Sequence, residues 1–162
     1  IVVNSFSKYF GMTGWRLGWM VVPAGWAEHA EKLMQNLFIN ASTPAQYAAL
    51  ACFTPEAEAI FESRRAAFKA RRDFLLPALR ELGFGIPIRP EGAFYLYANV
   101  EKFTDDSGEF AIQLLEKRGV AVTPGLDFEV SAPQKHVRFA YTTDLDRLAV
   151  AVDRIGTHLR SI

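Results

Sequence analysis

A short run near the start of the chain combines an amine, hydroxyls, flexible backbone and a guanidinium. Its members are Ser5, Ser7, Lys8, Gly11, Thr13, Gly14 and Arg16. A lysine at the end of a buried strand, beside a cation such as Arg16, would lose part of its preference for the ammonium form. The hydroxyls, the amides freed by the glycines and the guanidinium together suit an anion. The run therefore predicts a nucleophilic amine beside a phosphate site.

That pairing suits pyridoxal phosphate, because its aldehyde and its phosphate-bearing arm occupy adjacent ring carbons. The spacing alone fits a glycine-rich turn equally well, with Lys8 exposed and Arg16 on the surface, since Gly, Ser and Lys are common in turns. A Walker-type phosphate loop is excluded, because the chain contains no Gly-x4-Gly-Lys-Ser/Thr run. From the residues alone, a cofactor site and a plain turn both stay open.

The elements that must position this run are predicted from hydrophobic spacing. Residues 1–4 and 15–23 read as strands that lie close together, the first of them buried. The next predicted elements are an amphipathic helix over residues 26–39, a buried helix over 44–53, and a long helix from Pro55 to Gly83 with a kink at Pro77.

The second half predicts strands and helices in alternation. The strands fall at residues 94–100, 120–123 and 137–141, and the helices at 108–117 and 145–159. Mixed α/β architecture follows. The composition changes near Thr54, which places a domain boundary between residues 1–53 and residues 54–162.

Composition narrows the function classes. The chain has 162 residues, with 18 Lys plus Arg against 18 Asp plus Glu. No electrostatic footprint for nucleic acid or an anionic membrane is present, and no apolar stretch approaches the roughly 20 residues of a spanning helix. The lone Cys52 favours a reducing, cytoplasmic setting. His29, His136 and His158 fit no metal site or catalytic triad, and we expect them to be solvated or structural, with His29 and His158 on helix surfaces.

Two groups of basic residues need interpretation. The long helix carries Arg64, Arg65, Lys69, Arg71 and Arg72, which form either a basic patch or a solvated face paired with nearby carboxylates. On the strand over residues 137–141, Arg138 faces away from Val137 and Phe139, so it could take a carboxylate bidentately. It also fits a surface arginine on a half-exposed strand.

The run from Ser5 to Gly18 resembles the pyridoxal-phosphate attachment segment of class I aminotransferases, the aspartate aminotransferase superfamily, and Met-Thr-Gly-Trp-Arg at residues 12–16 is typical of it. Pro-Glu-Gly-Ala-Phe-Tyr at residues 90–95 resembles the family's Gly-x-Phe strand beside the active site. Val-Arg-Phe-Ala-Tyr at residues 137–141 resembles its arginine-bearing strand.

The resemblance implies a fold and a set of roles. The fold would be fold-type I, with residues 1–53 as the end of the large cofactor domain and residues 54–162 as an α+β small domain. Lys8 would form the internal aldimine with pyridoxal 5'-phosphate, and Ser5 and Arg16 would hold its phosphate. Arg138 would bind the substrate α-carboxylate, and Phe94 would line the substrate pocket. No metal is implied.

The implied activity is transfer of an amino group between an amino acid and a 2-oxo acid by a cytoplasmic homodimer. The family's ring-binding carboxylate, tyrosine and asparagine lie upstream of the lysine. We therefore expect residues 1–162 to be the carboxy-terminal portion of an aminotransferase, and to be inactive alone. Residues 1–4 and 44–53 should then expose apolar surface or be covered by another chain.

Other functions stay open. Fold-type I decarboxylases, lyases and synthases share the lysine segment, and some transcription regulators carry an aminotransferase-like effector domain. A degenerate interaction domain would not need Lys8, Arg16 and Arg138 together. Dicarboxylate-specific members often place a second arginine after the lysine segment. Residues 35–46 contain no basic residue, which leaves neutral and aromatic amino donors open.

Overall fold

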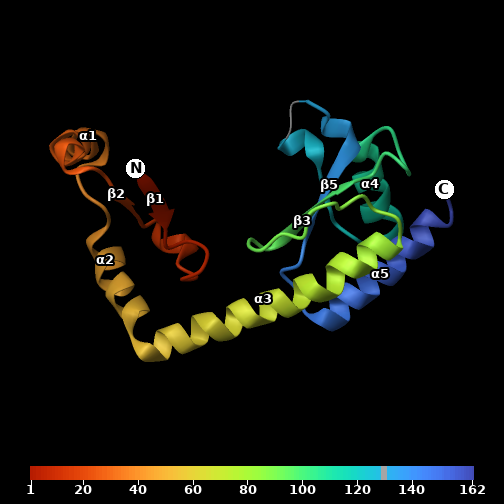
Figure 1. The fold of residues 1–162 in the computed structure, drawn as a ribbon, viewed down its shortest axis with the longest axis horizontal. Coiled ribbons are helices and arrows are strands. Elements are labelled where there is room, and N and C mark those ends of the chain that lie inside the picture. Colours follow the sequence, from red (N-terminus) through yellow and green to blue (C-terminus); the bar gives the residue numbers. More distant parts are fainter. Residues whose placement is uncertain (129–130) are drawn as a thin grey trace. The chain divides into compact units, whose positions relative to one another are not determined.

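A computed structural model describes residues 1–128 and 131–162, and the chain divides into two compact units, Ile1–Arg65 and Ala66–Ile162 (Figure 1). The division falls inside the long helix α3 (Pro55–Glu81), whereas the sequence places the boundary ahead of that helix, at Thr54. α3 continues through Pro77. The assignment of residues 1–53 and 54–162 to two functional domains stays a prediction.

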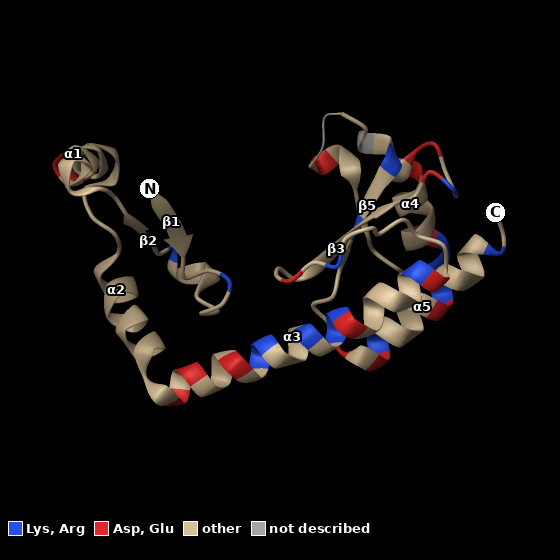
Figure 2. Cartoon of the chain, viewed as in Figure 1, with Lys and Arg blue, Asp and Glu red and all other residues tan. Residues whose placement is uncertain are grey.

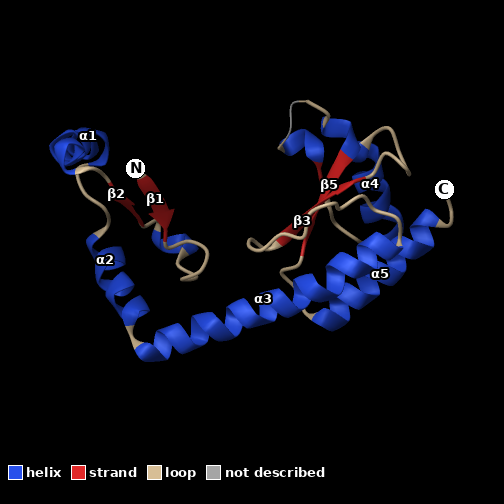
Figure 3. Cartoon of the chain, viewed as in Figure 1, coloured by secondary structure: helices blue, strands red, loops and turns tan. Residues whose placement is uncertain are grey.

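Unit 1 contains a strand pair and helices (Figure 3). Strand β1 (Val2–Ser5) pairs antiparallel with β2 (Gly18–Val21), as the sequence predicts, and helices α1 (Ala27–Phe38) and α2 (Thr43–Leu50) follow. β2 begins later than predicted. A short 3-10 helix, Thr13–Trp15, precedes it, and Arg16 has a left-handed φ of 53°, which interrupts an extended strand.

The apolar surface of unit 1 is exposed. Ile1, just before β1, is 76% exposed, Val3 on β1 is 71% exposed, and Tyr47 on α2 is 73% exposed. α2 carries no charged residue (Figure 2), yet only Ala45 and Ala49 on it are buried. The prediction that these segments expose apolar surface is therefore confirmed, and the prediction that residues of this chain bury them is wrong.

Unit 2 is built on an antiparallel sheet with the order β3-β5-β4. The strands are β3 (Tyr95–Asn99), β4 (Thr123–Pro124) and β5 (His136–Ala140). β4 is shorter than the predicted strand over residues 120–123. The reason is that the Val120 N–H donates to the Leu114 carbonyl at 3.2 Å and so completes the end of the preceding helix.

Two further helices complete unit 2, α4 (Ser107–Arg118) and α5 (Leu145–Leu159), close to the predicted bounds. The Asp106 side chain caps α4 by accepting from the backbone of Gly108 and Glu109. At the other end Gly119 adopts a φ of 64°, the usual left-handed end of a helix.

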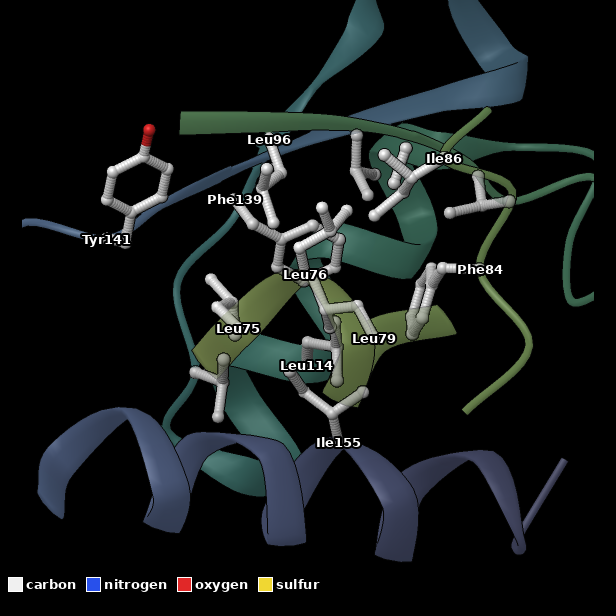
Figure 4. Packing of buried hydrophobic residues seen from close by; sticks show 14 of the residues in the cluster. Leu75, Leu76, Leu79, Phe84, Ile86, Leu96, Leu114, Phe139, Tyr141 and Ile155 are labelled. Atoms are coloured by element: carbon white, nitrogen blue, oxygen red, sulfur yellow. The ribbon is translucent and has the colours of Figure 1, made fainter. Parts of the chain in front are cut away.

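The core of unit 2 draws on every one of these helices and on the sheet (Figure 4). Its labelled members are Leu75, Leu76, Leu79, Phe84, Ile86, Leu96, Leu114, Phe139, Tyr141 and Ile155. Val137 and Phe139 are 0% and 4% exposed while Arg138 between them is half-buried, which confirms the predicted alternation along β5.

His158 corrects a prediction. It is 1% exposed rather than on the surface of α5, and its ring packs edge-on against Phe110 at 5.7 Å between centroids. Burial, with smaller contributions from the charges of Arg118 and Lys117, lowers the pKa of His158. The amphipathic spacing of α5 predicts the helix correctly. It does not show that α4 covers the last turn of α5, where His158 lies.

Acidic residues flank the basic group of α3 on both sides along the helix (Figure 2). Arg65 pairs with Glu62, Lys69 and Arg72 pair with Asp73, and Arg71 pairs with Asp144. These ion pairs argue against a basic patch. Arg65 and Lys69 are exposed, as a solvated face requires, but Arg72 is only 8% exposed, so that prediction is wrong for Arg72. No helix in the described part of the chain combines the length and apolar character needed to cross a membrane.

Candidate active site

The lysine loop, residues 6–17, is closed at its base by the strand pair. Ser5 at the end of β1 lies opposite Gly18 at the start of β2, and the Phe6 N–H donates to the Leu17 carbonyl at 3.0 Å. Gly18 must be glycine for this pairing, because a Cβ there would lie 2.8 Å from the Asn4 carbonyl oxygen. The loop therefore leaves and returns to one pair of strands.

A series of hydrogen bonds joins one side of the loop to the other. Ser5 Oγ accepts from the Ser7 N–H at 3.0 Å and donates to Ser7 Oγ at 2.9 Å. Thr13 Oγ1 donates to the Ser7 carbonyl at 2.6 Å, and Arg16 Nη1 donates to the Thr13 carbonyl at 3.0 Å. The structure thus brings Ser5 and Arg16, two predicted phosphate ligands, together with Lys8 on one short loop.

Buried side chains hold the loop from below. Phe6 and Met12 are each 6% exposed and form a small cluster with Ala49 of α2. The Met12 N–H donates to the Phe6 carbonyl, and Cys52 Sγ lies 3.3 Å from Met12 Sδ. Cys52 is half-buried and packs against this cluster as a small side chain.

The donor set of the loop fits a phosphorylated aldehyde. Ser5 and Arg16 are exposed, so a hydroxyl and a guanidinium are available to an anion, and Lys8 is exposed on the same loop. The exposure of Lys8 corrects one step of the sequence argument, since the described residues do not provide the burial that it invoked. β1 is itself exposed, which removes the expected apolar surroundings.

The profile of one protein family matches almost the whole chain. The family is described as "Aminotransferase class I and II", and the match covers residues 1–155. The chain belongs to this aminotransferase family. The lysine loop, the strand over residues 95–99 and the arginine-bearing strand β5 all lie inside the match.

Known family members agree in sequence and in fold. A valine–pyruvate aminotransferase of Mycobacterium tuberculosis is 41% identical over 161 residues, which cover 99% of this chain and 42% of that protein. A (5-formylfuran-3-yl)methyl phosphate transaminase of Methanocaldococcus jannaschii is 37% identical, over 98% of this chain and 42% of that protein. The crystal structure of an aminotransferase from Mycobacterium tuberculosis superposes with a TM-score of 0.94 at 41% identity, over 99% of this chain and 42% of that one.

These neighbours establish the fold as that of fold-type I aminotransferases, with a partial α/β unit and a second unit of mixed helices and strands. The chain spans about two fifths of the length of the relatives that it matches.

Arg138 lies in unit 2, among aromatic rings. Its guanidinium carbon is 4.4 Å from the centroid of the Phe128 ring and 5.5 Å from that of Tyr95. Nη2 donates to Thr123 Oγ1 at 3.3 Å, and Nε is buried without a hydrogen-bond partner in the part of the chain that is described. A planar guanidinium with aromatic rings close by keeps its in-plane edges for a bidentate partner such as a carboxylate.

Phe94 is half-buried immediately before β3, with its ring 5.7 Å from that of Tyr95. Its carbonyl accepts from the Tyr141 N–H at 2.9 Å, and the Tyr141 hydroxyl donates to the Ala93 carbonyl at 3.2 Å. Ala93 has a φ of 62°, a left-handed conformation that is uncommon for a residue with a Cβ. Phe94, immediately before β3, and Arg138, on the neighbouring strand β5, therefore both lie in unit 2.

The segment before Phe94 is anchored on α3. Asp73 accepts from Arg72 Nε and Nη2 at 2.9 and 2.8 Å and from Arg89 Nη2 at 2.8 Å, and Arg72 Nη1 donates to the Pro90 carbonyl at 3.0 Å. The hydrogen bonds from Arg72 and then Arg89 hold the pKa of Asp73 well below its usual value. This cluster restrains the segment that leads through Phe94 into β3.

Sequence reasoning missed the surroundings of Arg138. Thr123 is its register partner on β4, and Phe128 follows a 3-10 turn after that strand. The strand prediction over residues 120–123 could have indicated Thr123 as a neighbour, but no periodic pattern marks Phe128.

Proposed function

We propose that residues 1–162 are part of an enzyme that transfers an amino group between an amino acid and a 2-oxo acid with pyridoxal 5'-phosphate. The proposal concerns a polypeptide of the relatives' length, called here the full-length polypeptide. The observation that carries the proposal is the closed lysine loop. Ser5 at its base is linked to Arg16 through hydrogen bonds of Ser7 and Thr13, and Lys8 follows Ser7 directly on the same loop. The family match supports the same reaction class.

Ser5 and Arg16 would bind the phosphate, and the Lys8 amine would attach the aldehyde. When bound, the cofactor supplies the electron sink for the reaction. Lys8 Nζ would have two tasks, because it would hold the cofactor and, as a free amine, would take up the proton from the substrate α-carbon.

Arg138 would orient the substrate by its α-carboxylate. The unpartnered Nε, the nearby rings of Phe128 and Tyr95, and the hydrogen bond to Thr123 leave the guanidinium held in place with donor capacity to spare. Phe94, half-buried immediately before β3, would line the pocket for the substrate side chain.

A neutral amino donor is the proposed substrate class. Residues 35–46 contain no basic residue that could pair with a second carboxylate, and one of the relatives is named for valine and pyruvate. The full-length polypeptide is also proposed to be a cytoplasmic homodimer, in keeping with the exposed apolar surface of unit 1 and the single cysteine.

The first experiment locates the attachment. The full-length polypeptide is incubated with pyridoxal phosphate, reduced with borohydride and mapped by peptide mass. We expect the label on Lys8, its loss in Lys8→Ala, and its retention in the matched variant Lys32→Ala, which removes an exposed lysine of α1. A label that persists in Lys8→Ala would refute the assignment.

The second experiment measures donor specificity. A panel of valine, alanine, phenylalanine and aspartate is offered with pyruvate or 2-oxoglutarate as acceptor. Arg138→Gln should raise KM for every donor, by roughly 10- to 100-fold if a charge-assisted pair is lost. Arg147→Gln, at an exposed position of α5, is the control. Equal KM values for the two variants would exclude Arg138 as the carboxylate ligand.

A further inference from the structure

The outer part of the lysine loop packs against the first turns of α3. The Tyr9 ring lies 5.4 Å from the Phe61 ring, between centroids, and the Phe10 ring lies 5.6 Å from it in an edge-on arrangement. Phe61 is 7% exposed, although its neighbours on this part of α3 are mostly exposed. The loop itself is therefore what buries Phe61.

A polar contact adds direction to this packing. The Tyr9 hydroxyl donates to Glu62 Oε1 at 2.8 Å, and Arg65 donates to Glu62 Oε2 at 2.7 Å. The hydrogen bonds from Arg65 and then Tyr9 lower the pKa of Glu62, and the same contact raises the pKa of Tyr9. The carboxylate thus stays charged and the phenol stays protonated at neutral pH, which makes the Tyr9–Glu62 bond a charge-assisted one.

The backbone of the loop approaches α3 at Gly11. Gly11 has a φ of 67°, and a Cβ on it would lie 3.1 Å from Arg64 Nη1. Its N–H donates to the Lys8 carbonyl at 3.0 Å, which closes the turn over residues 8–11. Lys8 is therefore the first residue of a turn in which the second residue, Tyr9, contacts α3 and the last residue, Gly11, lies close to it.

We propose that Tyr9 and Glu62 are positioning residues for Lys8. The two residues hold the turn against α3 and so limit the directions in which the Lys8 side chain leaves the backbone. Ser5 and Arg16 hold the opposite side of the loop, so Lys8 is restrained from both sides. The inference rests on the proposed function, in which Lys8 is the residue that attaches pyridoxal phosphate.

The test compares Tyr9→Phe, Glu62→Gln and the double variant in the full-length polypeptide. Tyr9→Phe keeps the ring on Phe61 and removes the hydroxyl. Controls are Tyr47→Phe, which alters an exposed tyrosine of α2, and Glu58→Gln, one turn before Glu62, whose carboxylate acts on Tyr9 through charge alone. The measurements are the rate at which pyridoxal phosphate becomes reducible onto Lys8, the pH midpoint of its visible absorbance, and amide hydrogen exchange of residues 6–12 without cofactor.

If the Tyr9–Glu62 hydrogen bond positions Lys8, all three variants should be slower in attaching pyridoxal phosphate. Attachment to Lys8 should slow by roughly 2- to 10-fold, the range that corresponds to one lost hydrogen bond, with a shifted pH midpoint and faster exchange of residues 6–12. The double variant should be no worse than Tyr9→Phe, because Glu62→Gln only weakens, by removing the charge of the acceptor, the hydrogen bond that Tyr9→Phe removes altogether. The two controls should behave as wild type.

Unchanged attachment rate and pH midpoint in both Tyr9→Phe and Glu62→Gln would overturn the inference, even if thermal stability fell. Strictly additive effects in the double variant would also overturn it, since they would show two independent roles. An absence of label on Lys8 in the wild type would instead refute the proposed function, and the inference with it.

Discussion

Replacing Ala93 by glycine should stabilise unit 2, although the same change destabilises most positions. Ala93 has a φ of 62° and its methyl group is exposed, so no buried area is lost. A left-handed conformation costs a residue with a Cβ roughly 1–2 kcal/mol. Glycine also increases the conformational entropy of the unfolded chain, which lowers the free energy of unfolding by about 0.4–1 kcal/mol and so offsets part of the stabilisation. The net expectation is a stabilisation of about 0.5–1 kcal/mol.

Ala140→Gly is the matched control. Ala140 is also exposed and lies on β5 opposite Tyr95, one residue from Phe94, but it is part of an extended strand. Glycine should cost about 0.5–1 kcal/mol there. The two Ala-to-Gly variants are thus expected to differ by about 1–2 kcal/mol, with opposite signs.

The assay must report on unit 2 alone. All of the tryptophans, Trp15, Trp19 and Trp26, lie in unit 1, so tryptophan fluorescence follows the wrong part of the chain. Amide hydrogen exchange of β3 and β5 measures the opening free energy of the sheet directly. If Ala93→Gly lowered that free energy as much as Ala140→Gly, the left-handed backbone at Ala93 would be wrong, and with it the path by which the chain enters β3.

Three further predictions concern the same unit. Leu79→Ala should destabilise it by about 2–5 kcal/mol, because Leu79 is 0% exposed at the centre of the core, and a loss below about 1 kcal/mol in denaturant unfolding would contradict that packing. Asp106→Ala should cost about 0.5–2 kcal/mol by removing the cap of α4, and Asp106→Asn, which still accepts, should cost less; equal losses in exchange protection of α4 would argue against the cap. Because burial lowers the pKa of His158 in the folded state, the unfolded state binds the extra proton first, so stability should fall as the pH drops below about 6.5. His158→Leu should weaken this slope in unfolding measured between pH 5 and 8, and an unchanged slope would assign it to other groups.

Helices were predicted better than strands, for a physical reason. α5 spans residues 145–159 as predicted, because its apolar residues recur at helical spacing and one side of it packs on the core. The strand predicted over residues 120–123 is observed only as β4 (Thr123–Pro124), because the Val120 N–H completes the end of α4 next to Gly119 and is not available for strand pairing. The apolar composition that predicted the strand does not separate a helix end from a strand start.

Burial was predicted less well than secondary structure. Residues 1–4 have the composition of a buried strand. Residues 2–5 do form strand β1, yet Ile1 and Val3 are exposed. Composition reports the surroundings in which a segment is stable, and in the described chain those surroundings are absent from β1. For His158 the prediction was wrong in the opposite sense, since a residue expected at the surface is buried. A single polar residue on an amphipathic helix gives no sign of the neighbour that covers it.

The sequence places a turn between two strands at the lysine loop, and the structure has that turn, while the roles of its residues stay a prediction. A pair of short strands is marginally stable by itself, and β1 and β2 are both exposed, so they cannot order the loop alone. Phe6 and Met12, which lie within the loop, form the buried cluster under it. The same twelve-residue loop thus supplies packing residues, the glycine that its turn requires and the residues proposed to do chemistry. A segment whose structural and chemical requirements are interleaved in this way leaves few alternative sequences, which is why a function could be proposed from its residues alone.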